Sequence, residues 1–301
     1  MKSKASEGLN ELVLIKNILP CVFESITDSA NSNGRIPGLS TGIPDLDRSI
    51  MGFKNGDLII IGSRPGMGKK SFAMSIALHV ARTSRKSIAV FSSETSREQL
   101  SLNFLSSESG IDRQKLKMGK MTNEEWERLT DSATMLSTFN ILINDDAALT
   151  VSKITKQCSQ VRNLGLIIVQ DIEYIQPVQI DLEDSCDDFC DDRNDINLAM
   201  KLMAKELDVP VICLSNISRA GEMRQNMRPI LSDFRDTGAM DIYADIVLAL
   251  YRDYYYDMEP ENEGIAECLV LRNRRGETDR IYLQWQPEYA RLSPFDSFYE
   301  E

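Results

Sequence analysis

The sequence predicts an α/β fold in which helices cover a mostly parallel central sheet, and three observations indicate this class. Between residues 36 and 295, short apolar runs alternate with helical stretches, which is typical of successive strand–helix–strand units. A glycine-rich turn joins the apolar run DLIIIG to the apolar helix SFAMSIALHVA, as at the start of such a unit. Two further apolar runs flank Gly276, so we expect a hairpin to close the sheet.

Eight runs have the length and apolar character of buried strands. They span residues 58–62, 87–91, 140–143, 166–169, 209–214, 245–250, 266–271 and 280–284. No internal repeat is visible. We therefore expect one compact domain over residues 36–295, followed by a tail at 296–301.

An amphipathic helix is expected ahead of this domain. Apolar residues recur at helical spacing over residues 9–30, and Pro20 within that stretch marks a kink. The polar stretch SANSNG then separates the helix from the domain. Residues 1–35 are therefore predicted to form a linker helix and a flexible connector.

Composition excludes several classes. The 301 residues are 42% hydrophobic and 27% charged, as in ordinary globular proteins. No run of 18 apolar residues occurs, so no membrane contact is predicted, and the polar first twenty residues do not form a secretory signal. The net charge of −12 is opposite to that of a dedicated nucleic-acid binder. Any contact with DNA must therefore be argued from particular residues.

The six cysteines are scattered along the chain. Three lie in apolar runs such as PVICLS and ECLVL, where free thiols act as small core residues. This pattern indicates a reducing, cytoplasmic setting.

One segment has an unusual composition. Between residues 181 and 195, eight acidic residues stand against the single Arg193, which is typical of a solvated, mobile loop. Cys186 and Cys190 within it raise the alternative of a metal site. Structural zinc sites need a second pair of Cys or His ligands, which this segment lacks. We therefore prefer the interpretation as a solvated loop.

The strongest functional signal is the turn between the first strand and its helix. Backbone N–H groups of such a turn and the helix N-terminus bind phosphate, while a lysine reaches the outer phosphates. The alternative is a glycine-rich turn without a ligand. The candidate nucleotide-binding residues of this turn are Ser63, Arg64, Pro65, Gly66, Met67, Gly68, Lys69, Lys70 and Ser71.

Two positions depart from the usual phosphate-binding pattern. Ser63 replaces its first glycine, a mild change, and Lys70 replaces the Ser or Thr whose hydroxyl ligates Mg²⁺. Ser71 is expected to face another side of the helix and is a poor substitute. Mg²⁺ binding is therefore doubtful, although ATP binding is expected.

Carboxylates that could complete the site follow two other strands. Glu94 comes just after the strand 87–91, where a carboxylate beside the turn can polarise an attacking water. After the strand 166–169 come Gln170, Asp171, Ile172 and Glu173. The metal-binding acid therefore stays open between Asp171 and Glu173.

From about residue 10 to 292 the chain resembles the motor domain of DnaB-type replicative helicases. Six blocks carry the resemblance in family order: GLSTGIPDLDRSIMGF, SRPGMGKKSFAMSIA, VFSSETSREQL, ELDVPVICLSNISR, RPILSDFRDTGAMDIYADIVLALYRDYYY and LVLRNRRGETDRIYLQW. The resemblance implies a RecA-like ATPase core that forms a hexameric ring, with ATP between subunits. It also implies that the helix at 9–30 docks on the adjacent subunit, and that the family's N-terminal helical domain has no counterpart here.

The resemblance assigns roles to individual residues. It implies that Lys69 binds phosphates, that Glu94 activates water and that Asn216 senses the phosphate. Arg272 and Arg274 fall where the family places the basic fingers that reach a neighbour's γ-phosphate. Single-stranded DNA would be held by the loop containing Arg235, Asp236 and Gly238.

Three hypotheses follow. The first is an active ring helicase driven by ATP on single-stranded DNA. The second is a catalytically weakened paralogue that binds nucleotide and regulates or assembles with a true DnaB-type helicase. It is suggested by Lys70, by the unclear metal-binding acid and by the acidic segment, which would repel DNA near a ring's bore. The third is a stand-alone, recombinase-like ATPase, which leaves the linker helix unused.

Overall fold

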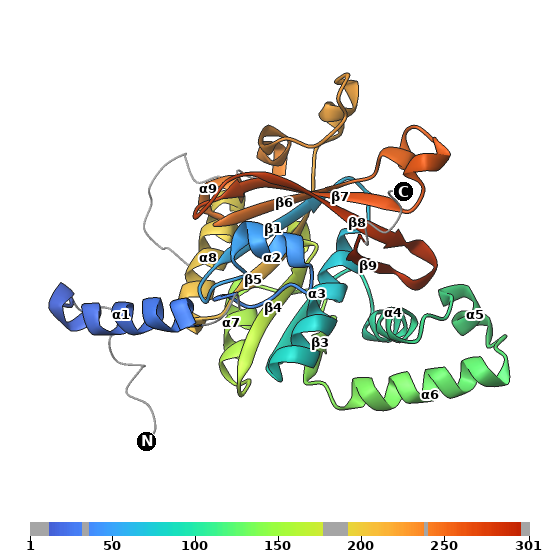
Figure 1. Cartoon of the computed structure of the whole chain (residues 1–301), viewed down its shortest axis with the longest axis horizontal. Coiled ribbons are helices and arrows are strands. Elements are labelled where there is room, and N and C mark those ends of the chain that lie inside the picture. Colours follow the sequence, from blue (N-terminus) through green and yellow to red (C-terminus); the bar gives the residue numbers. More distant parts are fainter. Residues whose placement is uncertain (1–11, 32–35, 177–191, 238–239, 296–301) are drawn as a thin grey trace. The chain divides into compact units, whose positions relative to one another are not determined.

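The computed structural model describes residues 12–31, 36–176, 192–237 and 240–295. The chain divides into two compact units, Met1–Pro37 and Gly38–Glu301, whose elements are drawn in Figure 1. The first unit contains α1 (Ile15–Asn31), a single helix that runs through Pro20. Its start differs from the predicted residue 9, because apolar spacing locates a helix but does not define its ends.

The second unit is built on one nine-stranded sheet with the order β3-β2-β4-β5-β1-β6-β7-β8-β9 (Figure 1). Strands β1 to β6 pair in parallel, and β7, β8 and β9 extend the sheet antiparallel. The predicted α/β class and mostly parallel sheet are confirmed, as is the hairpin around Gly276. The strands are β1 (Leu58–Ser63), β2 (Ser87–Ser92), β3 (Ile141–Asn144), β4 (Leu164–Gln170), β5 (Val211–Asn216), β6 (Ile246–Tyr251), β7 (Ile265–Asn273), β8 (Asp279–Gln286) and β9 (Arg291–Pro294).

Three differences from the predicted strands have local causes. The sequence did not predict β9, in which only Leu292 is buried. Strand β5 begins at Val211 rather than at 209, because Pro210 has no N–H to donate to the ladder. Asp245 precedes β6, and its carboxylate accepts a hydrogen bond from the N–H of Leu58 at 2.8 Å.

The helices of this unit connect the strands. Ser96, Thr122 and Thr150 cap the helices that follow them by accepting a backbone hydrogen bond. None of the described helices has the length and apolar character needed to cross a bilayer. The helices are α2 (Pro44–Ile50), α3 (Lys69–Ser84), α4 (Arg97–Ser109), α5 (Arg113–Met118), α6 (Asn123–Ser137), α7 (Val151–Ser159), α8 (Asp192–Leu207) and α9 (Met240–Tyr243).

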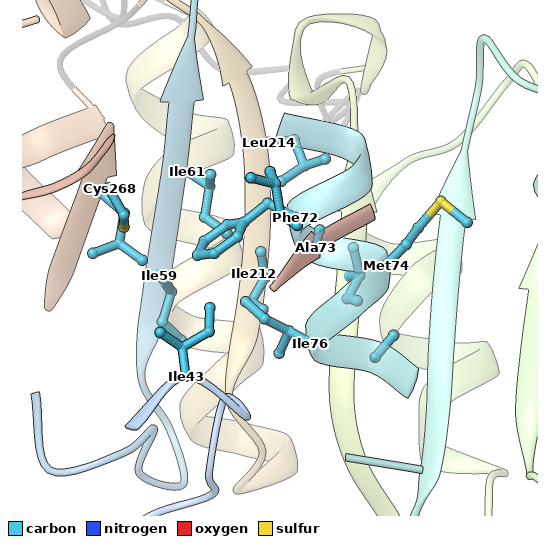
Figure 2. Close-up of a cluster of buried hydrophobic side chains, with 14 of the residues drawn as sticks. Ile43, Ile59, Ile61, Phe72, Ala73, Met74, Ile76, Ile212, Leu214 and Cys268 are labelled. Atoms are coloured by element: carbon cyan, nitrogen blue, oxygen red, sulfur yellow. The ribbon is translucent and has the colours of Figure 1, made fainter. Parts of the chain in front are cut away.

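Helices cover both faces of the sheet. Because side chains alternate along a strand, β1 sends Ile59 and Ile61 to one face and Leu58 and Ile60 to the other. The first face packs against α2, α3 and α4, and the second against α7 and α8. Figure 2 shows Phe72 of α3 directed toward the strands on the first face. This packing fixes the start of α3 relative to the end of β1.

Three cysteines are core residues, and for Cys213 and Cys268 the apolar runs around them predicted this. Cys158, Cys213 and Cys268 are free and buried. Burial raises the pKa of Cys158 and of Cys268 to about 12, so neither forms a reactive thiolate near neutral pH.

Gly62 in β1 offers a test of this packing. A Cβ at this position would lie 2.2 Å from the buried Phe234 ring and 2.8 Å from Ile217. We expect Gly62→Ala to lower the free energy of unfolding by about 1–3 kcal/mol, the usual cost of overpacking, in denaturant titrations. The control is Gly276→Ala in the turn between β7 and β8, where the added methyl would meet only the end of the Asn273 side chain closely, at 2.7 Å. Equal losses in the two variants would contradict this explanation.

Candidate functional site

The carboxyl ends of the parallel strands meet at one edge of the sheet. Ser63 at the end of β1 pairs with Asn216 of β5, and Ser92 at the end of β2 pairs with Gln170 of β4. Ligands of open α/β sheets bind beyond this edge. The turn after β1 and the segments after β2, β4 and β5 therefore surround one site.

Residues 64–68 form the turn that leads from β1 into α3. Gly66 (φ 82°) and Gly68 (φ 97°) have left-handed backbone, which residues with a Cβ rarely adopt. A Cβ at Gly68 would also lie 2.9 Å from the Trp285 ring. Lys69 is the first residue of α3, and Gly68 provides no side-chain cap. The first N–H groups of the helix can therefore bind an anion.

A hollow of about 380 Å³ lies over this turn. The side chain of Met67 is buried in the core beside α3, so only its backbone is available for the predicted nucleotide binding. One expectation from the sequence needs correction here. Ser71 was expected to face another side of the helix, but it lines the hollow. The lining residues are Ser63, Arg64, Pro65, Gly66, Gly68, Lys69, Lys70, Ser71, Glu94, Asp171, Tyr174 and Asn216.

Side chains from outside the turn, which the sequence analysis missed, hold it in place. Arg252 donates from Nη2 to the carbonyl oxygen of Gly66 at 2.8 Å, and its guanidinium lies 5.0 Å from the centre of the Trp285 ring. Arg64, only 2% exposed, donates from Nη1 to the hydroxyl of Tyr256 at 2.8 Å. The signal in the sequence is the aromatic run YRDYYY, but nothing in that run indicates that it folds back onto the turn.

Lys69 lies inside the hollow. Its Nζ donates a hydrogen bond to Oδ1 of Asn216, so the predicted phosphate-binding lysine and phosphate-sensing amide are in contact. Burial lowers the pKa of Lys69, although the charges of Glu173 and Asp171 oppose this effect. The ammonium is thus partly desolvated and has one neutral partner, which leaves donors for a phosphate oxygen.

Lys70 makes contacts that the sequence did not predict. Its Nζ donates to Oε2 of Glu94 and, at 3.2 Å, to the hydroxyl of Thr95. It also lies 3.1 Å from Oδ2 of Asp171. Burial lowers the pKa of Lys70 by less than these two carboxylates raise it, so the pKa is above its usual value. The hydrogen bond from Lys70 also lowers the pKa of Glu94. The ammonium is therefore held between two carboxylates.

The acids after β4 have different positions. Asp171 is buried and lines the hollow, with a left-handed backbone (φ 59°) that turns the chain out of the strand. Burial raises the pKa of Asp171 despite the neighbouring Lys70. Glu173 instead accepts hydrogen bonds from the hydroxyl of Ser215 at 3.0 Å and the N–H of Asn216 at 2.5 Å. Of the two candidate acids, Asp171 is the one placed beside Lys70.

The carboxylates closest to the turn are engaged within the chain. Mg²⁺ takes oxygen ligands, but the nearby carboxylates of Glu94 and Asp171 already contact the Lys70 ammonium. Lys70 also stands where a hydroxyl ligand was expected. In the described part of the chain, no group of three or more His, Cys, Asp and Glu side chains could hold a metal ion.

A family model described as the DnaB-like helicase C terminal domain matches residues 38–294. The chain belongs to this family. The replicative DNA helicase DnaB of Geobacillus stearothermophilus is 37% identical over 290 residues, which cover 95% of this chain and 63% of that protein. The replicative DNA helicase DnaC of Bacillus subtilis (strain 168) is 39% identical over 281 residues, which cover 92% and 61%. The chain thus spans about three fifths of the length of these relatives.

Solved structures agree with the family assignment. One of them, described as an ATPase domain, superimposes with a TM-score of 0.87 at 30% identity, covering 95% of this chain and 100% of that domain. A DnaB-like replicative helicase, described with its interactions with primase, gives 0.82 at 30% identity, covering 95% and 68%. The second unit is therefore a RecA-like ATPase domain of the DnaB-like type.

The two candidate arginine fingers of this DnaB-like domain lie far from its own hollow. Arg272 pairs with Val247 near the start of β6. The N–H of Arg274 donates to the carbonyl oxygen of Asp245 at 2.9 Å, level with Leu58 at the start of β1. At about 3.3 Å per residue, the five steps from Leu58 to Ser63 span roughly 16 Å. Neither arginine lines the hollow.

The candidate DNA-binding residues are only partly described. Arg235 and Asp236 belong to the 3-10 helix Leu231–Thr237, but the placement of their side chains lies outside the description, as does Gly238. The acidic segment 181–195, with Cys186 and Cys190, also lies outside it, apart from the backbone at the start of α8.

Proposed function

We infer that this chain is the ATP-binding motor domain of a DnaB-like helicase that acts in DNA replication in the cytoplasm and translocates on single-stranded DNA. The observation that carries the proposal is the phosphate cradle. Gly66 and Gly68 open the turn, α3 directs its free N–H groups at the hollow, and Lys69 lies inside it. The family's named relatives, replicative DNA helicases, support the choice of process.

The positions of the arginines support a ring. Arg272 and Arg274 lie near the amino-terminal ends of the parallel strands, whereas Lys69 lies beyond their carboxyl ends. We propose that they reach a nucleotide held by another subunit. Arg274 is half exposed, and its guanidinium contacts the Asp245 carboxylate and the Ile242 carbonyl oxygen of its own chain. The stand-alone ATPase hypothesis gives these arginines no phosphate to contact and is the least favoured.

A specific observation favours the second candidate function. Lys70 binds Glu94 and Asp171, so the proposed water-activating carboxylate is engaged and the metal site is altered. A subunit of this kind would bind ATP and complete a neighbour's site through Arg272 and Arg274 without rapid turnover of its own. It would regulate, or assemble with, a true DnaB-type helicase.

ATP turnover of the purified chain, with and without single-stranded DNA and Mg²⁺, distinguishes the two candidates. Turnover that requires Mg²⁺ and is stimulated by DNA supports the active helicase. Nucleotide binding with little turnover under all conditions supports the weakened paralogue. If no nucleotide binds, both proposals are wrong.

Helix α1 provides a test of assembly. Its apolar side chains, including Ile15, Leu19, Val22, Phe23 and Ile26, are exposed, and its own unit has no second described element to cover them. A face of this kind usually marks an interaction surface. We expect deletion of residues 1–30 to lower the mass measured by light scattering, with little change in the unfolding midpoint of the core.

Two substitutions serve as the matched comparison. Ile18→Asp with Phe23→Asp keeps the helix but charges its apolar face, and should lower the mass as the deletion does. An unchanged mass in both variants would exclude α1 from assembly.

A further inference from the structure

In the hollow, the ammonium group of Lys70 occupies a site surrounded by side-chain oxygens of the same chain. Lys70 is the second residue of α3, and its Nζ is contacted by oxygens from two other segments. Glu94 and Thr95 come from the end of β2, and Asp171 from the end of β4, with Nζ–oxygen distances of 3.2 Å to Thr95 and 3.1 Å to Asp171. Three oxygens around one ammonium nitrogen match its three N–H donors.

The charged groups that line the hollow are Arg64, Lys69, Lys70, Glu94 and Asp171. Arg64 also lies 3.8 Å from Glu222, so its charge is already paired. Without Lys70 the two carboxylates would face Lys69 alone, and a triphosphate would need an external cation. A divalent ion near the same carboxylates would instead be repelled by the Lys70 ammonium a few Å away.

We propose that this hollow binds metal-free nucleoside triphosphate, with the Lys70 ammonium taking the place of the divalent cation. The inference rests on the proposed nucleotide binding at the same turn. The backbone cradle and Lys69 supply the sequence-independent part of phosphate binding. Lys70 lines the same hollow with its three N–H donors on oxygens of the chain. Its charge therefore acts on the phosphates through space, at the place where other sites of this type hold Mg²⁺.

The same contact has a consequence for turnover. Glu94 is the carboxylate placed to polarise water, and its Oε2 accepts a hydrogen bond from Lys70. A carboxylate engaged in this way is a weaker proton acceptor, because the ammonium stabilises its charged form. The ammonium that replaces the cation therefore also restrains hydrolysis, and bound nucleotide is retained.

The test measures binding of a fluorescent N-methylanthraniloyl ATP to the full chain, in EDTA and in excess Mg²⁺. For the unmodified chain we expect dissociation constants that agree within about threefold in the two conditions. A larger ratio would mean that Mg²⁺ adds binding free energy comparable to one charge-assisted hydrogen bond. Lys70→Thr should lose about tenfold or more in EDTA and recover in Mg²⁺. Lys117→Thr, the same change on the exposed face of α5, should behave as the unmodified chain.

The outcomes separate this inference from the function on which it rests. Tight binding by the unmodified chain only in Mg²⁺ overturns the inference and leaves ATP binding standing. Absence of binding in both conditions overturns both. If Lys70→Thr has a lowered unfolding midpoint, Lys70→Met is used instead. It removes the charge without adding a ligand, so its loss of affinity in EDTA should persist in Mg²⁺, and unchanged affinity in EDTA would contradict the inference.

Discussion

Replacing Lys70 by threonine is expected to raise Mg²⁺-dependent ATP hydrolysis by at least about a hundredfold over the unmodified chain, since metal ions contribute several kcal/mol to such reactions. The substitution removes the ammonium that contacts Glu94 and Asp171, and it restores a hydroxyl at the position that usually ligates the metal. Both changes act on the hydrolysis of bound ATP. Phosphate release measured with and without Mg²⁺ gives the effect.

Second substitutions show which acid the restored activity uses. Asp171 lines the hollow and lies 3.1 Å from Lys70, so adding Asp171→Asn to Lys70→Thr should abolish the gain. Glu173 is bound to Ser215 and Asn216, so adding Glu173→Gln should leave most of it. Robust Mg²⁺-dependent hydrolysis by the unmodified chain, stimulated by single-stranded DNA, would contradict the prediction and favour the active helicase.

Local patterns in the sequence were enough to predict the framework of the fold. Apolar strands and the glycine-rich turn are short-range features, and the parallel sheet with its hairpin follows from their order. Strand β9 could not be found in this way, because a four-residue edge strand with one buried side chain has no pattern of its own. It is positioned by pairing with β8.

The part of the site that one continuous segment forms could be predicted from the sequence. The parts that several distant segments form together were harder to predict. The turn from Ser63 to Ser71 was visible because its spacing is fixed by phosphate binding. The choice between Asp171 and Glu173 was not, because it depends on the left-handed turn at Asp171. The support of the turn by Arg252 and Trp285 joins segments nearly 200 residues apart, which no local pattern reveals.

Lys70 also combines a feature that the sequence shows with contacts that only the structure shows. The sequence indicated that an ammonium replaces the ligand hydroxyl. Only the arrangement of β2 and β4 beside α3 showed that this ammonium has carboxylate partners in its own chain. The sequence therefore identifies an unusual residue at a known position, but the groups that neutralise its charge are known only from the tertiary structure.

Lys69→Met is expected to weaken ATP binding by about ten- to a hundredfold, the range of one or two charge-assisted hydrogen bonds, and equally in EDTA and in Mg²⁺. We expect Lys69 to contact the nucleotide directly, because its Nζ lies in the hollow beside Asn216. Its effect should therefore not depend on which cation is present, unlike that of Lys70→Thr. Titration of the fluorescent nucleotide measures both variants side by side.

Stability provides the control for this variant. Lys69 is 8% exposed, and burial lowers its pKa, which means that the folded chain disfavours this charge. Replacing a buried ammonium that has one neutral partner by an apolar side chain of similar length should then leave the unfolding midpoint unchanged or raise it. A lower affinity at unchanged stability assigns Lys69 to the ligand. If stability and affinity fall together, Lys69 has a structural role and the cradle is not its main partner.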